Sequence, residues 1–148
     1  MEHRIHVVTL AVEDLERSLV FYRDGLGFES PGVIGTEHPG DAKNAAGAVV
    51  MFELAGGLVL ALYPRSELAK DANVDLETAS SSSFSLGHIV PERQDVDALL
   101  AAAAAAGARI TEAPRTRPWG IYSGYFRDLD GHLWEIIWDS TARSIEHP

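Results

Sequence analysis

Apolar residues in the first half of the chain recur with the periods of strands and of one amphipathic helix. Asp14 is a plausible N-cap for that helix, and Gly27 tolerates the left-handed backbone that ends it. A Gly-Gly connection at 56–57 indicates a hairpin. The elements expected in this half are a strand over 5–12, a helix over Asp14–Leu26, a weak strand over 28–34, and strands over 48–54 and 58–63.

The same pattern returns in the second half, with Asp95 as the expected helix cap and Gly107 as the end of the helix. The expected elements are a strand over 84–90, a helix over 96–106, a strand over 108–111, and a hairpin of strands over 122–127 and 133–138. Each half therefore reads β-α-β-β-β. The sequence predicts a single α+β domain over 1–148, built of a first module over 1–70, a serine-rich linker over 71–83 and a second module over 84–140.

Composition narrows the class of protein. The chain has 148 residues, a net charge of −10 and no cysteine. Clustered basic residues are needed to bind phosphate backbones or anionic lipid, so we expect no nucleic acid or membrane partner. The chain has no long apolar run and its first residues lack the features of a signal peptide, so we expect a cytoplasmic protein.

One charged residue interrupts the most apolar strand. Glu135 lies between Trp134 and Ile136 in the run GYFRDLDGHLWEIIW, residues 124–138. A carboxylate is costly to bury without a partner. Glu135 therefore marks a cavity that receives a ligand, or a strand face that is open to water. It is the candidate catalytic residue, as a general base.

Two motifs at opposite ends of the chain resemble a known family. The pattern VTLAVxDLxxSxxFYxxxLGF over 8–28 is similar to the opening of the vicinal oxygen chelate superfamily, and WGxYSGYFxDxDGHLWE over 119–135 is similar to its closing signature. This superfamily contains glyoxalase I, bleomycin-resistance proteins, fosfomycin-resistance enzymes and extradiol dioxygenases. The resemblance implies two modules whose sheets curl around a shared cavity, in a homodimer.

The resemblance also implies a metal site with four ligand positions, two in each module. The first module retains neither of its two. The usual histidine position of the first strand falls on Val7, and the usual glutamate position of the fourth strand falls on Ala61. Side chains on a strand alternate between its two faces, so His6 points away from the expected cavity unless a bulge intervenes.

In the second module, only Glu135 matches both the motif and the alternation of the strand. The same alternation makes His88 a core histidine that faces the helix, although a different alignment of the motif makes it a ligand. We therefore predict no metal and no other cofactor. If a divalent ion (Zn, Ni, Mn or Fe) is bound nevertheless, we expect Glu135, His88 and His6 as its ligands.

Aromatic residues in the glycine-punctuated segment 118–125 are the candidate ligand-binding residues. Trp119, Tyr122 and Tyr125 have polar tips and lead into the strand beside Glu135, which suits a small, partly apolar ligand. Alternatively, the tyrosines pack at a seam between modules or subunits. Glu135 is then a relic that is solvated, or paired with an arginine such as Arg115 or Arg117.

Two functional hypotheses follow. The first is a protein that binds or sequesters a small molecule, like the bleomycin-resistance branch, which needs a cavity but no metal. The second is a metal-dependent lyase, isomerase or dioxygenase that resembles glyoxalase I. The absence of ligand side chains at Val7 and Ala61 favours the first.

Overall fold

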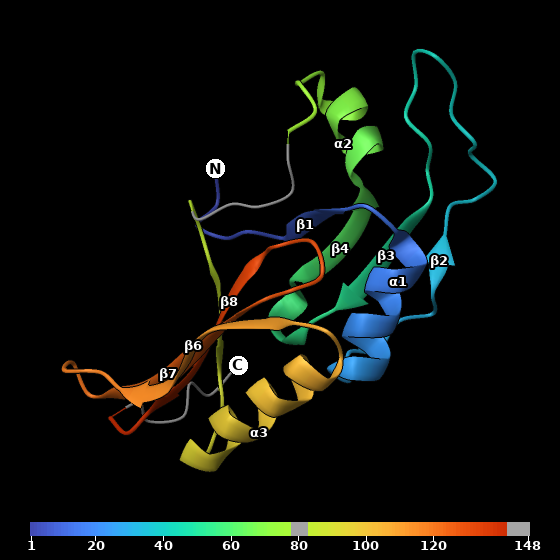
Figure 1. Cartoon of the computed structure of the whole chain (residues 1–148). Coiled ribbons are helices and arrows are strands. Elements are labelled where there is room, and N and C mark those ends of the chain that lie inside the picture. Colours follow the sequence, from blue (N-terminus) through green and yellow to red (C-terminus); the bar gives the residue numbers. More distant parts are fainter. Residues whose placement is uncertain (78–82, 142–148) are drawn as a thin grey trace. The chain divides into compact units, whose positions relative to one another are not determined.

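The computed structural model describes residues 1–77 and 83–141. The chain divides into two compact units, Met1–Ala79 and Ser80–Pro148. Each unit holds a four-stranded mixed sheet, with strand order β1-β4-β3-β2 in the first and β5-β8-β7-β6 in the second (Figure 1). In both sheets the first strand pairs in parallel with the last, and the remaining pairs are antiparallel. This repeated topology confirms the predicted α+β fold of two modules.

The first unit contains one more helix than the sequence predicted. Its elements are β1 (Val7–Val12), α1 (Leu15–Leu19), the π-helix η1 (Val20–Gly25), β2 (Val33–Ile34), β3 (Val49–Glu53), the 3-10 helix η2 (Ala55–Gly57), β4 (Val59–Pro64) and α2 (Arg65–Ala72). The additional helix, α2, is polar and buries only Ala69, so its sequence carries little helical periodicity. Its last two residues fall in the segment that was expected to be linker.

Local backbone chemistry explains the start of the first helix and the turn between β3 and β4. Asp14 is the N-cap, as predicted, and its side chain accepts a hydrogen bond from the backbone N–H of Arg17 at 3.1 Å. The single helix expected over Asp14–Leu26 is instead α1 followed by η1. The expected hairpin is present, since β3 and β4 pair antiparallel, and its connection is a 3-10 turn in which Gly56 has a φ of 79° that other residues rarely adopt.

The second unit follows the predicted order of elements. They are β5 (Leu86–Ile89), α3 (Arg93–Ala105), β6 (Arg109–Thr116), β7 (Ile121–Arg127) and β8 (Leu133–Asp139). The helix begins three residues earlier than expected because Glu92, and not Asp95, is its N-cap. Asp95 instead completes a capping box, since its carboxylate accepts a hydrogen bond from the backbone N–H of Glu92 at 3.0 Å.

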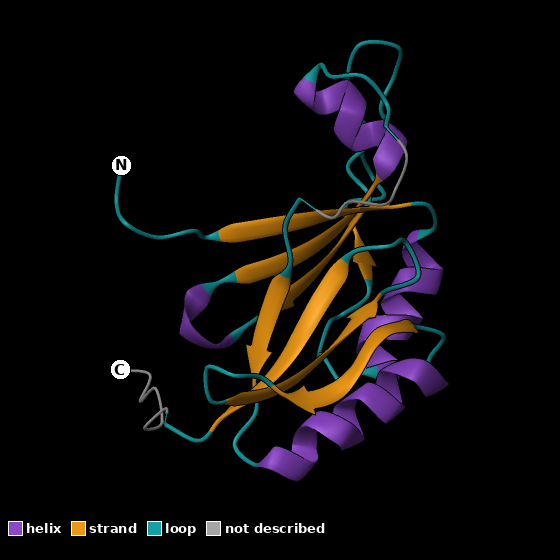
Figure 2. Cartoon of the chain, turned by 60° about the vertical axis from the view of Figure 1, so that its left-hand side comes forward, coloured by secondary structure: helices purple, strands orange, loops and turns teal. Residues whose placement is uncertain are grey.

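The position of α3 gives the second sheet two different faces. In that unit α3 lies along β6, β7 and β8 (Figures 1 and 2). It packs so closely that a Cβ added to Gly124 would lie 2.5 Å from Cδ1 of Leu100. Gly124 is opposite Ile136, which is 2% exposed, so this side is the helix face. Glu135 and Tyr125, the neighbours of these two residues along the strands, point to the other side, which we call the Glu135 face.

The burial pattern of β1 agrees with the predicted alternation, but in β4 the three consecutive residues Leu60, Ala61 and Leu62 are all buried. Leu10 and Val12 in β1 are at most 1% exposed, whereas Val7 is 52% exposed. Phe21 and Tyr22 belong to the core, with ring centroids 4.9 Å apart. Within the described residues, no helix has both the length and the apolar character that crossing a membrane requires.

The turn between β7 and β8 is fastened by a single carboxylate. Oδ1 of Asp128 accepts hydrogen bonds from the backbone N–H of Asp130 at 3.0 Å and of His132 at 2.8 Å. Its Oδ2 lies 2.8 Å from Nδ1 of His132, and the side chain of Asp128 is only 1% exposed. Asp128 therefore sets the register of the two strands that carry Tyr125 and Glu135.

We expect Asp128→Ala to lower the free energy of unfolding by about 2 kcal/mol or more, because two backbone donors in the turn lose their acceptor. Denaturant unfolding measures this change. The control is Glu112→Ala, which removes an exposed ion pair with Arg115 and should cost less than about 1 kcal/mol. Equal effects of the two substitutions would contradict the role of Asp128 in the turn.

Candidate functional site

Glu135 lies at the centre of the second sheet. Its strand, β8, runs between β5 and β7, so that Glu135 has Gly87 on one side and Tyr125 on the other. Gly87 has no side chain, and a Cβ added there would lie 3.6 Å from Cδ1 of Ile137, which occupies the space beside that position. Glu135 is half-buried. The carboxylate therefore projects from one face of the sheet, between a glycine and a tyrosine on the neighbouring strands.

A directed chain of hydrogen bonds reaches Glu135 from a buried arginine. Nε of Arg117 donates to Oγ of Ser123 at 3.2 Å, and its Nη2 donates to the backbone carbonyl of Ser123 at 3.3 Å. Oγ of Ser123 in turn donates to Oε2 of Glu135 at 2.9 Å. Arginine can only donate, so the single hydroxyl hydrogen of Ser123 must point to Glu135. Arg117 is 7% exposed and Ser123 is fully buried.

This chain compensates the charge of Glu135 without a direct ion pair. A buried guanidinium and a half-buried carboxylate would each be costly alone, and the intervening hydroxyl links them. The structure thus links Glu135 through Ser123 to Arg117, one of the two arginine partners expected in the alternative in which Glu135 is a relic. Arg115 is exposed and pairs with Glu112 at 3.3 Å instead.

Tyr125 completes the polar group around Glu135. Its pKa is raised above the ordinary value of 10.0, first by burial and then by the charge of Glu135 and a hydrogen bond to it. The guanidinium of Arg117 lies 5.8 Å from the centre of the Tyr125 ring. We call Arg117, Ser123, Tyr125 and Glu135 the Glu135 cluster.

The other two predicted ligand-binding residues lie away from this cluster. Tyr122 is on the helix face, where its hydroxyl donates to Oδ1 of Asp97 in α3 at 2.7 Å. That hydrogen bond is the main reason why the pKa of Tyr122 is raised, and Arg93 lies over its ring at 4.2 Å. Trp119 is 72% exposed in the loop between β6 and β7. A ligand-binding role for these two residues stays a prediction.

The donor atoms present do not fit the family's metal site. Val7 and Ala61 have no donor atoms in their side chains, and Gly87 next to Glu135 has no side chain at all. Among the described residues no three His, Cys, Asp or Glu side chains form a group that could hold a metal ion. His6 is exposed, and its backbone carbonyl accepts a hydrogen bond from Val59. The metal content stays a prediction.

His88 is on the predicted face but is not a core residue. It is opposite Ile136 and therefore lies on the helix face, away from Glu135. The prediction that it is buried was wrong, because His88 is exposed. The reason is the reach of α3, which packs on β6, β7 and β8 while β5 extends past its edge.

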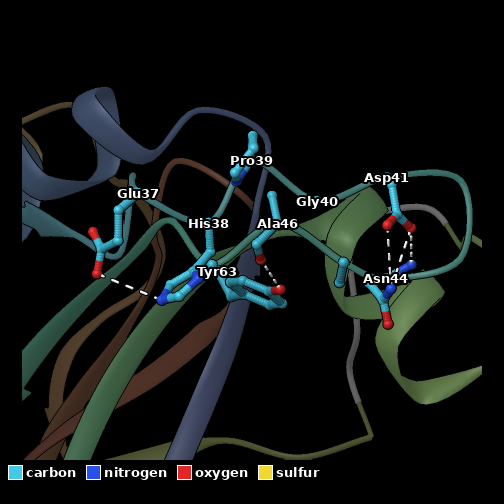
Figure 3. Close-up of a pocket in the computed structure, with 10 residues that line it drawn as sticks. Glu37, His38, Pro39, Gly40, Asp41, Asn44, Ala46 and Tyr63 are labelled. Carbon is cyan, nitrogen blue, oxygen red and sulfur yellow. Dashed lines mark hydrogen bonds and ion pairs between the residues drawn. The ribbon is translucent and has the colours of Figure 1, made fainter.

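A hollow lies in the first unit, at the loop between β2 and β3 (Figure 3). Its volume is about 610 Å³. The lining residues are Glu37, His38, Pro39, Gly40, Asp41, Asn44, Ala45, Ala46, Gly47 and Tyr63. Asp41 and Asn44 point toward one another, and the Asp41 carboxylate accepts from the Asn44 amide. The carboxylate of Asp41 and the amide of Asn44 are therefore already partly engaged in hydrogen bonds within the loop.

Three side chains from β4 and α2 hold this loop. The hydroxyl of Tyr63 donates to the carbonyl of Ala46, and Oε2 of Glu67 accepts from the N–H of Ala46 at 2.9 Å. Nζ of Lys70 donates to the carbonyl of Asp41 at 2.9 Å. The helix α2, which the sequence pattern did not predict, thus anchors the loop that contains His38.

Comparison with known proteins places the chain in a family. A model of the Glyoxalase/Bleomycin resistance protein/Dioxygenase superfamily matches residues 4–136. The chain therefore belongs to this superfamily, which confirms the resemblance seen in its two terminal motifs. No curated protein matches the sequence.

Solved structures share this fold. A glyoxalase-related enzyme from Fulvimarina pelagi is 29% identical, with a TM-score of 0.77 over 93% of this chain and 89% of that one. A glyoxalase/bleomycin resistance protein/dioxygenase from Nocardioides is 22% identical, with a TM-score of 0.68 over 97% and 89%. The fosfomycin resistance protein FosX from Listeria monocytogenes is 20% identical, with a TM-score of 0.66 over 95% and 97%. The last two similarities show the fold alone.

We expect Glu135→Gln to lower the pKa of Tyr125 toward its ordinary value of 10.0, because the neighbouring negative charge is removed. A titration of phenolate absorbance, compared with that of Tyr125→Phe, identifies the contribution of this tyrosine. Because the pKa of Tyr125 is raised in the folded state, this residue stabilises the protein below pH 10, and the stabilisation is lost as the pH rises above 10. Glu135→Gln should therefore also reduce the loss of stability at alkaline pH. An unchanged titration curve would contradict the contact.

Proposed function

We propose that the protein binds a small molecule at the Glu135 face and needs no metal to do so. The observation that carries this proposal is the chain from Arg117 through Ser123 to Glu135. The chain fixes the orientation of a carboxylate and neutralises its charge, and β5 leaves the neighbouring position without a side chain. A binding or sequestering role uses these features directly, since it requires a preformed polar anchor and no reactive centre.

The chemistry of the anchor indicates how a ligand is held. Ser123 and Tyr125 donate to Glu135 from the protein side, and a carboxylate has room for further donors. A ligand that presents a hydroxyl or an amine supplies such a donor. On the same face, Ile89 and Ile137 lie opposite one another on β5 and β8, and Ile89 is 49% exposed. These residues supply apolar contact, so the proposed ligand is partly apolar.

The alternative function is a metal-dependent lyase, isomerase or dioxygenase. The family membership and the 29% identity to a glyoxalase-related enzyme support it, as does the glutamate at the closing motif. The lack of side-chain donor atoms at the other family positions disfavours this alternative, and for that reason binding is the preferred proposal. A third route, with Glu135 as a metal-free general base, uses the same cluster.

We further propose that the protein is a cytoplasmic homodimer. The absence of cysteine is consistent with a reducing compartment. The net charge of −10 is consistent with a protein that binds neither nucleic acid nor anionic lipid. The homodimer is the assembly that the family resemblance implies.

Glu135→Gln should weaken ligand binding by about tenfold or more, because a hydrogen bond to a charged acceptor is worth about 1.5–3 kcal/mol. The fold should be little affected, because glutamine keeps an oxygen that accepts from Ser123. A thermal-shift screen of small acids, aldehydes and glycopeptides on both proteins measures the difference.

The matched control for this screen is Glu112→Gln, which removes a carboxylate from an exposed position of the same unit. Compounds that bind the unaltered protein should bind Glu112→Gln with the same affinity. Hits that bind Glu135→Gln and the unaltered protein equally well would show that Glu135 is only a relic.

Metal analysis separates the two main functions. We expect protein purified without a chelator and without an affinity tag to contain no stoichiometric Zn, Ni, Mn or Fe, because Val7 and Ala61 offer no donor atom. Elemental analysis by mass spectrometry measures this. An equimolar metal content that is abolished by Glu135→Ala would instead establish the metal-dependent alternative.

A further inference from the structure

The guanidinium of Arg117 has a hydrogen-bonding edge to spare. Its Nε and Nη2 form one edge, and both donate to Ser123. Within the described parts of the chain, no acceptor takes a hydrogen bond from Nη1. The second edge, formed by Nη1 and Nη2, is the one that binds a carboxylate through two parallel hydrogen bonds. Arg117 as a whole residue is only 7% exposed, so a planar anion bound to this edge is held in a less polar environment than at an exposed arginine.

The spacing of the two charges defines the ligand further. Two hydrogen bonds, of 3.2 and 2.9 Å, separate Nε of Arg117 from Oε2 of Glu135. The guanidinium and the carboxylate therefore lie close together through Ser123, and a small ligand that carries its two polar groups on neighbouring carbon atoms suits this pair. Its acceptor must face Arg117, and its donor must face Glu135.

The balance of charge decides what the donor is. A carboxylate bound to Arg117 brings a second negative charge close to Glu135, in a protein whose net charge is already −10. An ammonium group on the neighbouring carbon removes this repulsion and pairs with Glu135. A zwitterion thus satisfies both ends of the Glu135 cluster and adds no net charge.

We propose that the ligand of the Glu135 face is a free 2-amino acid with an apolar side chain. Its carboxylate binds the unused edge of Arg117, its ammonium group donates to Glu135, and its side chain contacts Tyr125 and the apolar pair Ile89 and Ile137. This inference rests on the proposed binding function and names the class of ligand.

Three compounds of one shape test the inference by calorimetric titration. They are L-phenylalanine, L-phenylalaninamide, which lacks the carboxylate, and 3-phenylpropionate, which lacks the ammonium group. L-leucine and L-leucinamide form a second pair. We expect each amino acid to bind, and each compound that lacks one charged group to bind on the order of tenfold more weakly or less.

Variants then assign the two ends. Arg117→Lys keeps the charge but loses the two-pronged edge, so it should lower affinity for L-phenylalanine by a larger factor than affinity for L-phenylalaninamide, which does not use that edge. Glu135→Gln should show the reverse preference: affinity for L-phenylalaninamide should fall, whereas affinity for 3-phenylpropionate should be little changed. The control is Arg115→Lys, whose side chain is exposed and pairs with Glu112. If Arg117→Lys does not fold, as its circular dichroism would show, the comparison of compounds on the unaltered protein still decides.

The outcomes separate this inference from the proposed function. Selective binding of the amino acids supports both. If the broad screen finds ligands that depend on Glu135, but amino acids bind no better than their amides, the inference is overturned and the binding function stands. If neither set of compounds binds, both are overturned.

Discussion

The hydrogen bond from Ser123 to Glu135 is the contact on which the chemistry of the second unit depends. It joins two strands on one face of the sheet, and it exists because Tyr125 is directly opposite Glu135 in the antiparallel pair. A shift of the pairing by one residue would turn Glu135 into the packing of α3 and Ile136 into water. The register is in turn fixed at the turn by Asp128, whose buried carboxylate holds the backbone of Asp130 and His132.

The helix face makes this arrangement stable. Leu100 of α3 packs against Gly124, and there is no room for a side chain at that position. Phe126 and Trp134 stack with ring centroids 6.1 Å apart on the same side. One face of the sheet is thus committed to packing, which leaves the other free to carry polar groups. The unit tolerates the cost of burying the Glu135 cluster because the packing of the apolar face stabilises the fold.

Much of this could be predicted from the sequence, since periodic patterns determine which face a residue occupies. The duplication, the cap at Asp14 and the placement of Glu135 on the face opposite the helix follow from the spacing of apolar residues and from one polar exception. The π-helix η1, the helix α2 and the exposure of His88 could not be predicted, because they depend on packing and on how far α3 extends. The part played by Ser123 also escaped, although it is two residues from Tyr125 and so on the same face; nothing in the sequence distinguishes it from an ordinary strand serine.

The fixed direction of the Ser123 hydroxyl has a consequence for any molecule that approaches. Arg117 cannot accept a hydrogen bond and the ionised Glu135 cannot donate one, so the hydroxyl has a single orientation between them. The three groups therefore form a permanent electric dipole along the surface of the sheet, positive at the arginine and negative at the carboxylate. The field of this dipole favours an antiparallel alignment of an approaching polar molecule, which speeds productive encounters, and it disfavours the reversed orientation.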